Sequence, residues 1–239
     1  TTIVTGSIVN SGTVTGASGY LSFDHGSTYE HARNAGDIPL ASWDNHSTCL
    51  VTGVTNTIPT IETFNQALGN LTWNCPSQNS DLSFDAQLVS VTGDFSLVST
   101  GTGSLRLMNG GGTGTYVNYL TGNFIQSGGE FYVLGTYDFS GAMDFHVGGD
   151  FSLSGGKFYL DANPNTGSAA TMFVGGNFTL GSGTTFSEVG SGTDIINFNG
   201  TSPQVYTSAI SLTNTINVVV SNGATLQMGT GASPSVLSG

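Results

Sequence analysis

One short phrase recurs along the middle of this chain, and it limits the possible folds more than any other feature. The phrase consists of glycine, an aspartate or asparagine, an apolar residue and further strand-forming residues. Its copies begin at Gly93, Gly122, Gly149 and Gly176, and an earlier copy begins at Gly69. The last four starts are spaced by about 27–29 residues, and self-similarity at a period of roughly 20–50 residues is typical of solenoid proteins.

Two further patterns repeat between these phrases. A hydrophobic residue follows a Gly/Ser cluster in each unit, namely Leu105, Phe131, Phe158 and Phe186. The segments Phe145-His146-Val147 and Met172-Phe173-Val174 each precede the next opening phrase. Three short strands separated by glycine-rich corners predict a parallel β-helix, in which each strand pairs with its equivalent in the next coil at about 4.8 Å. We therefore predict one all-β domain over residues 1–239, with about 20–27 residues in each coil.

The interval between phrases shortens to about 20 residues after Val189, if Ile196-Asn197-Phe198 and Asn217-Val218-Val219 are further copies. This alignment predicts two ladders along the stack. The apolar ladder comprises Leu71, Phe95, Phe124, Phe151, Phe178, Phe198 and Val218. The polar column comprises Asn70, Asp94, Asn123, Asp150, Asn177, Asn197 and Asn217. We interpret the polar column as structural, because stacked amides can bond each other and the backbone at a bend.

Charge excludes two classes of partner. The chain has 15 acidic and 3 basic residues, a formal charge of −12. Nucleic-acid binding requires phosphate neutralisation by Lys and Arg, and docking on anionic lipid has the same requirement. No apolar run approaches the roughly 20 residues that cross a bilayer, so membrane insertion is not expected. Calcium binding is compatible with the charge, although solubility alone explains an acidic surface; no cofactor is expected.

The stretch 24–48 breaks the regular pattern. It contains three of the four histidines and one of the two tryptophans, together with Pro39 and several Gly and Asn residues. We predict an irregular loop that projects from the stack, since binding residues favour loops on rigid scaffolds. The candidate ligand residues are His31, Trp43, Asp44 and His46. A metal set of His25, His31, Asp44 and His46 is an alternative, but its spacing matches no standard ligand pattern, and ordinary exposed polar residues would also explain it.

The two cysteines, Cys49 and Cys75, are separated by nearly one repeat of the chain. At equivalent places on successive coils, their Cα atoms would be about 5 Å apart, within the range of a disulfide. Two unpaired buried thiols are the alternative, and a shared metal is less favoured because two thiolates supply half of a zinc site.

The motifs favour a chain without catalysis. There is no nucleophile elbow, Walker loop or His-Glu-x-x-His sequence. Parallel β-helices do include pectate lyases and polygalacturonases, but Asp138, Asp144 and Asp150 need not share a face, and basic groups are scarce. A carbohydrate-active module, binding or cleaving polysaccharide, is the alternative. Aromatic residues that could stack on sugar rings are Trp43, Tyr116, Tyr119, Tyr132 and Tyr137.

Several segments carry a resemblance to a known group of proteins. They are Ile38-Pro39-Leu40-Ala41-Ser42-Trp43, Leu68-Gly69-Asn70-Leu71-Thr72-Trp73-Asn74-Cys75-Pro76, the Val-Gly-Gly-Asp/Asn-Phe repeats and Ile196-Asn197-Phe198-Asn199-Gly200. Together they resemble the repetitive surface proteins of Bacteroidetes that are exported by the type IX secretion system. The resemblance implies a right-handed β-helix and an extracellular or cell-surface location, and it defines no catalytic residues.

The combined expectation is an acidic β-helical stalk that presents residues 24–48. The sorting domain expected at the C-terminus of such proteins has no counterpart here, so we expect a fragment with neighbouring domains in a longer chain. Glycans or other surface proteins are the expected partners.

Overall fold

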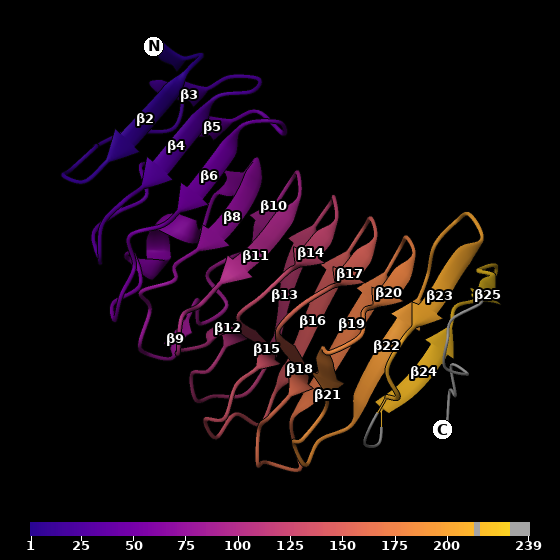
Figure 1. Cartoon of the computed structure of the whole chain (residues 1–239). Coiled ribbons are helices and arrows are strands. Elements are labelled where there is room, and N and C mark those ends of the chain that lie inside the picture. Colours follow the sequence, from indigo (N-terminus) through magenta and orange to yellow (C-terminus); the bar gives the residue numbers. More distant parts are fainter. Residues whose placement is uncertain (213–215, 230–239) are drawn as a thin grey trace.

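The computed structural model describes residues 1–212 and 216–229, and within them the chain winds as a parallel β-solenoid (Figure 1). One sheet, called the long sheet below, receives one strand from every coil. Its strands are β2 (Ser7–Asn10), β4 (Thr28–His31), β6 (Thr48–Val51), β8 (Asn70–Asn74), β11 (Phe95–Ser99), β14 (Phe124–Gln126), β17 (Phe151–Leu153), β20 (Phe178–Leu180), β23 (Gln204–Ser208) and β25 (Leu226–Met228). All neighbouring pairs among them are parallel.

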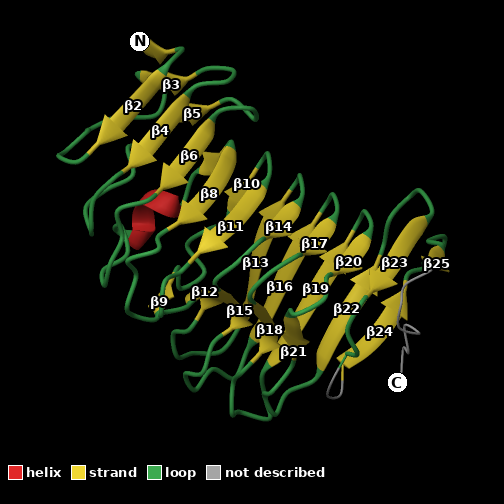
Figure 2. Cartoon of the chain, viewed as in Figure 1, coloured by secondary structure: helices red, strands yellow, loops and turns green. Residues whose placement is uncertain are grey.

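In each described coil one strand precedes the strand of the long sheet, and it belongs to one of two further sheets. A three-stranded sheet serves the first coils, with β1 (Thr2–Val4), β3 (Leu21–Phe23) and β5 (Ser42–Trp43). A seven-stranded sheet serves the later coils, with β7 (Ala67–Leu68), β10 (Ser90–Val91), β13 (Thr115–Leu120), β16 (Ala142–Val147), β19 (Ala169–Val174), β22 (Asp194–Phe198) and β24 (Ile216–Val220). The short 3₁₀ helix η1 (Ile61–Phe64) precedes β7 and is the helix visible in Figure 2.

Among the described residues a third side is formed only in the middle of the solenoid. Its five-stranded sheet contains β9 (Leu82–Ser83), β12 (Leu105–Met108), β15 (Glu130–Leu134), β18 (Lys157–Asp161) and β21 (Thr185–Ser187). Here Leu105, Phe131, Phe158 and Phe186 are in register, as the sequence pattern predicts. Three strands per coil is therefore confirmed for this middle region, whereas the first coils contain two.

Coil length explains where the third side occurs. The in-register positions of the long sheet are Ile8, Tyr29, Cys49, Leu71, Phe95, Phe124, Phe151, Phe178, Tyr206 and Met228. The coils before Leu71 and after Tyr206 contain about 20–22 residues each, at the short end of solenoid repeats, and have length for two strands and their corners. The coils between Leu71 and Tyr206 contain about 24–29 residues each and accommodate a third strand.

The predicted register is correct as far as Phe178 and wrong beyond it. The long-sheet partner of Phe178 is Tyr206, so Phe198 and Val218 do not continue the apolar ladder. Phe198 pairs with Val174 in the seven-stranded sheet, where Asn197 pairs with Phe173, and Asn217 pairs with Ile195. The predicted interval of about 20 residues therefore compares strands of two different sheets. The alignment is misleading because Asn-Phe or Asn-Val pairs occur in both sheets, before Phe178 in one and as Asn197-Phe198 and Asn217-Val218 in the other.

Two columns of stacked aromatic rings form the core of the middle region. The rings of Phe124 and Phe151 are 5.3 Å apart and nearly parallel, and those of Phe158 and Phe186 are 5.1 Å apart at 6°. Rings of the two columns meet edge to face, as between Phe151 and Phe158 at 5.0 Å and 87°. In-register parallel strands place equivalent residues one above another. A Phe repeated at the same place in successive coils is therefore sufficient to form these stacked ring contacts.

Candidate functional site

Residues 24–48 form an ordinary coil of the solenoid, so the prediction of a projecting irregular loop is wrong. The stretch includes β4 and β5 and ends where β6 begins. Tyr29, His31 and Ile38 are fully buried. The alternation in Thr28-Tyr29-Glu30-His31 is a half-buried strand pattern, and the Gly, Asn and Pro residues around it form the corners of a short coil.

His31 is a structural residue and not a candidate ligand. Its Nε2 lies 2.8 Å from the carbonyl oxygen of Ala35, and its Nδ1 lies 3.2 Å from the hydroxyl of Tyr29. Burial lowers the pKa of His31, since a charged imidazole loses its hydration there. Both ring nitrogens are therefore engaged inside the core.

Trp43 also contributes mainly to packing. Its ring stacks on that of Phe23, with centroids 4.2 Å apart and planes at 16°. The indole Nε1 donates a hydrogen bond of 3.0 Å to Oε1 of Gln66 in the next coil. This half-buried position leaves Trp43 a poor platform for a sugar ring, which needs an open aromatic face.

The remaining two candidate residues, Asp44 and His46, lie together with His25 on the surface. Oδ1 of Asp44 is 3.5 Å from Nδ1 of His25 and 3.4 Å from Nδ1 of His46. The two imidazole rings are 4.5 Å apart. Within the described residues this is the one group of three or more His, Cys, Asp or Glu side chains close enough to share a metal ion.

Two stacked corners bring these three side chains together. His25 lies between β3 and β4 in Asp24-His25-Gly26-Ser27, and the other two lie between β5 and β6 in Asp44-Asn45-His46-Ser47. In each corner the serine N–H donates to the aspartate carbonyl oxygen at 2.9 Å. The Asp44 carboxylate also accepts the backbone N–H of His46 at 2.8 Å. This bond, followed by the nearby His25 and His46, lowers the pKa of Asp44.

The polar column is a hydrogen-bonded ladder over its first five members. Side-chain Oδ1 atoms of Asn70, Asp94, Asn123 and Asp150 each accept the backbone N–H of the next member, at 2.8, 2.7, 2.8 and 2.6 Å. Asn177 then accepts the N–H of Val205 at 2.9 Å. Asn197 and Asn217 belong to the seven-stranded sheet and are not part of the column. The structural interpretation thus describes Asn70 to Asn177.

Glycines beside the column are required by close approach. A Cβ added to Gly122 would lie 2.4 Å from the carbonyl oxygen of Gly93, and one added to Gly149 would lie 2.4 Å from Oδ1 of Asn123. Because atoms of the coil below fill this space, the glycine of the repeated phrase cannot carry a side chain here.

Substitution of Asn123 by alanine is expected to destabilise the chain by about 1 kcal/mol, since the Asp150 N–H loses its protein acceptor at a solvent-exposed position. Asn123→Asp retains the acceptor but places a third carboxylate between Asp94 and Asp150, so its cost should decrease when the pH is lowered to about 4. Urea unfolding at pH 7 and pH 4 measures both effects, with Ser152→Ala in β17 as the control. Equal stabilities for Asn123→Ala and the control would contradict the ladder's role.

Cys49 and Cys75 are both free and buried, so the expected disulfide is absent. In the long sheet Cys49 pairs with Leu71, and Cys75 lies four residues further along the chain. Four residues of extended strand span about 13 Å, well beyond disulfide reach. The cysteine spacing is therefore longer than the local coil, which runs from Cys49 to Leu71. Burial raises the pKa of both thiols to about 12, which keeps them protonated and unreactive.

The predicted sugar-binding aromatics do not form one surface. Tyr132 is buried, whereas Tyr119 and Tyr137 are more than half exposed. Tyr119 belongs to an outward-facing column on the seven-stranded sheet: its ring is 4.9 Å from His146, which stacks on Phe173 at 4.3 Å. This column covers both faces of the His146 ring and lines a shallow hollow that also includes Thr121.

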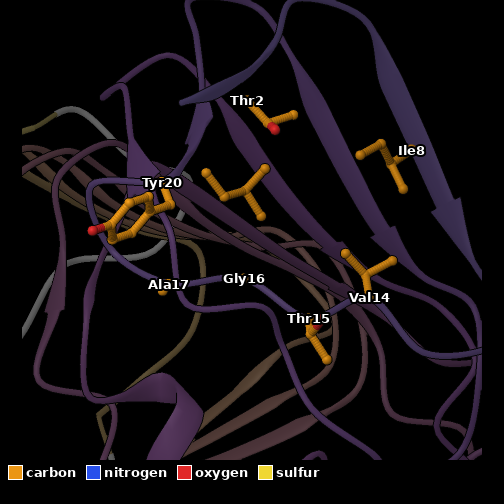
Figure 3. A pocket seen from close by; sticks show the side chains of 8 residues that line it. Thr2, Ile8, Val14, Thr15, Gly16, Ala17 and Tyr20 are labelled. Atoms are coloured by element: carbon orange, nitrogen blue, oxygen red, sulfur yellow. The ribbon is translucent and has the colours of Figure 1, made fainter.

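A pocket at the N-terminal end lacks catalytic groups. Figure 3 shows the side chains around it, which come from the first coil and include Ile8, Val14, Thr15 and Tyr20. The lining contains no carboxylate, imidazole, thiol or basic group. Such a pocket can accommodate apolar groups but offers no acid–base pair for hydrolysis or elimination.

Sequence reasoning missed a group of buried carboxyls near the end of the third side. Asp161 and Asp194 are fully buried and Glu188 nearly so. Asp194 Oδ1 accepts the N–H of Ala170 at 2.8 Å, while its Oδ2 is buried without a hydrogen-bond partner. Burial, and then the charges of Asp161 and Glu188, raise the pKa of Asp194 to about 7. The signal in the sequence is an aspartate directly before the apolar pair Ile195-Ile196 in β22.

Comparison of the chain with protein-family models, with curated protein sequences and with solved structures finds no match. No helix in the described ranges has the length and apolar character needed to span a membrane. The fold and the local chemistry therefore carry the functional argument.

Proposed function

We propose that this chain is a structural or adhesive β-solenoid segment of a larger secreted, cell-surface protein and that it performs no catalysis. The observation that carries the proposal is the long sheet, in which strands from every described coil pair in parallel without interruption. A continuous ladder of this kind separates its two ends by a fixed distance, which is what a spacer requires.

Surface composition supports an extracellular setting. The net charge of −12 and the abundance of uncharged polar residues suit an exposed, soluble surface. The resemblance to repetitive Bacteroidetes proteins exported by the type IX system supports the same location. Neighbouring domains of a longer chain, other surface proteins and glycans are the partners that we propose.

Carbohydrate binding is the alternative, and the hollow beside Tyr119 favours it most. Tyr119 is 55% exposed, and its neighbours in the hollow include His146 and Thr121. An aromatic edge with nearby hydroxyl and imidazole groups could contact a sugar, although the rings in this column stack on each other. This arrangement supports weak binding better than turnover.

The location is tested with antibodies raised against the folded chain. Labelling of intact producing cells or of their medium supports the proposal, whereas labelling only after lysis contradicts it. A glycan array with assays for reducing ends and for unsaturated products tests the alternative. Turnover of any polysaccharide would contradict the non-catalytic proposal, and binding lost in Tyr119→Ala would favour the carbohydrate module.

A further inference from the structure

We propose that His25, Asp44 and His46 bind one divalent transition-metal ion, with Zn²⁺ as the probe, across the corners of two successive coils. The inference does not depend on the proposed function. It concerns a site that joins residues from the β3–β4 and β5–β6 corners, which lie one above the other in the stack.

The ligand atoms are already close to their required separations. Zinc bonds of about 2.0–2.2 Å in a tetrahedral centre place ligand atoms about 3.3 Å apart. The observed separations from Asp44 Oδ1 are 3.5 Å to His25 Nδ1 and 3.4 Å to His46 Nδ1. One ligand atom from each side chain lies within 4.8 Å of the other two. Small rotations of the two exposed imidazoles would bring both nitrogens to bonding distance.

The donor set selects the class of ion. Two imidazoles and one carboxylate suit Zn²⁺, Cu²⁺, Ni²⁺ or Co²⁺, whereas Ca²⁺ and Mg²⁺ prefer a shell of oxygen atoms. Three protein ligands leave at least one coordination position for water. Here the side chains of His25 and His46 are 71% and 62% exposed, so an ion can reach the site directly from solvent.

The backbone around the site is held in place before any ion binds. Asp44 N–H donates to the carbonyl oxygen of Phe23 at 2.9 Å, which ties the second corner to the end of β3. The carboxylate is oriented by the N–H of His46. A ligand set that is already oriented loses less conformational entropy on binding. An ion bound here would connect two of the short coils that lack the third side.

The experiment is isothermal titration of the whole chain with ZnCl₂, combined with thermal unfolding at saturating zinc. We expect one ion per chain with a Kd in the micromolar range, and a higher melting temperature with zinc because the ion binds the folded chain preferentially. His25→Ala and His46→Ala should each weaken binding by about tenfold or more, since loss of even an outer-shell partner costs about that much.

Two matched controls accompany these variants. Asp24→Asn is the control for Asp44→Asn, since both remove one carboxylate charge. Asp44 is a proposed ligand, whereas Asp24 is the equivalent aspartate of the preceding corner. His146→Phe removes a histidine that packs in an aromatic column elsewhere. Circular dichroism establishes that each variant is folded. Absence of zinc binding by the original chain, or equal binding by the His25 and His46 variants and the two controls, would overturn the proposal.

Discussion

Replacing Asp194 by asparagine is expected to stabilise the chain at pH 8 and to leave its stability at pH 4 nearly unchanged. Asp194 is fully buried, and Asp161 and Glu188 add negative charge near it. Its pKa is raised from 3.8 to about 7 in the folded chain. Asparagine retains the acceptor for the N–H of Ala170 and carries no charge at any pH.

The sign of the pH dependence follows from proton linkage. Between about pH 4 and pH 7 the folded chain holds a proton on Asp194 that the unfolded chain has lost. The free energy of unfolding therefore falls as the pH rises through this range. Each pKa unit corresponds to about 1.4 kcal/mol. Between pH 4 and pH 8, ionisation of Asp194 should therefore lower the free energy of unfolding by about 4 kcal/mol.

Urea unfolding at several pH values measures this effect. The original chain should lose stability between pH 4 and pH 8 more steeply than Asp194→Asn, and the two curves should meet near pH 4. Asp24→Asn, which neutralises an exposed carboxylate, should follow the original chain. Parallel curves for the original chain and Asp194→Asn, or a variant that is less stable at pH 8, would show that Asp194 does not carry a buried proton.

Truncation of Phe124 is expected to cost about 3–5 kcal/mol, because alanine leaves a cavity where the core is stacked most densely. The centroids of five other aromatic rings lie within 5.6 Å of the centroid of the Phe124 ring. They belong to Phe95, Phe131, Phe145, Phe151 and Phe158. Its two neighbours in the long sheet lie in adjacent coils, so the cavity would weaken three coils at once.

Ile125→Ala is the matched control for Phe124→Ala. Ile125 is the next residue in β14, but its side chain points outward and is 37% exposed. Its replacement should cost no more than about 1 kcal/mol, the range of strand propensities. Thermal and urea unfolding measure the loss of stability in both variants. Similar losses for Phe124→Ala and Ile125→Ala would mean that the two faces of β14 are not an inner and an outer face.

The middle of the fold could be predicted from the sequence because in-register stacking makes structural repeats visible as sequence repeats. Phe95, Phe124, Phe151 and Phe178 occupy the same place in successive coils, and each must satisfy the same neighbours. The glycine before each of them is likewise constrained by the coil below. Nearly identical residues therefore recur at equivalent places in these coils, and their spacing in the sequence predicts both the length of each coil and the strand register.

The ends of the solenoid were predicted less well because coil length changes there. Beyond Phe178 the long sheet continues with Tyr206, and Gln204-Val205 stands in place of the usual Gly-Asn phrase. Near the N-terminus the coils are shorter than in the middle, so the spacing of Cys49 and Cys75 no longer corresponds to one coil. Where the coil length varies, two residues that are one average repeat apart in the sequence no longer occupy equivalent places in successive coils.

The candidate site shows the same limitation. Its members His25, Asp44 and His46 were recognised as ligand types, but His31 was grouped with them although it lies in a buried position of β4. Separating buried His31 from the three surface residues requires knowledge of the local coil length, because this length places His25 and Asp44 at stacked corners. The raised pKa of Asp194 depends on its burial and on the charges of Asp161 and Glu188 from other parts of the chain, which no local pattern encodes.

The central claim is that each coil of the long sheet stacks in register and parallel on the next, and a double-cysteine crosslink tests it most directly. Ile125 in β14 pairs with Ser152 in β17, and both side chains face outward. Paired strands are about 4.8 Å apart, within disulfide range. Ile125→Cys/Ser152→Cys should therefore crosslink under mild oxidation, whereas Ile125→Cys/Thr179→Cys, two coils apart at about 10 Å, should not. Equal crosslinking of both pairs, or crosslinking only of the second, would contradict the stacked solenoid.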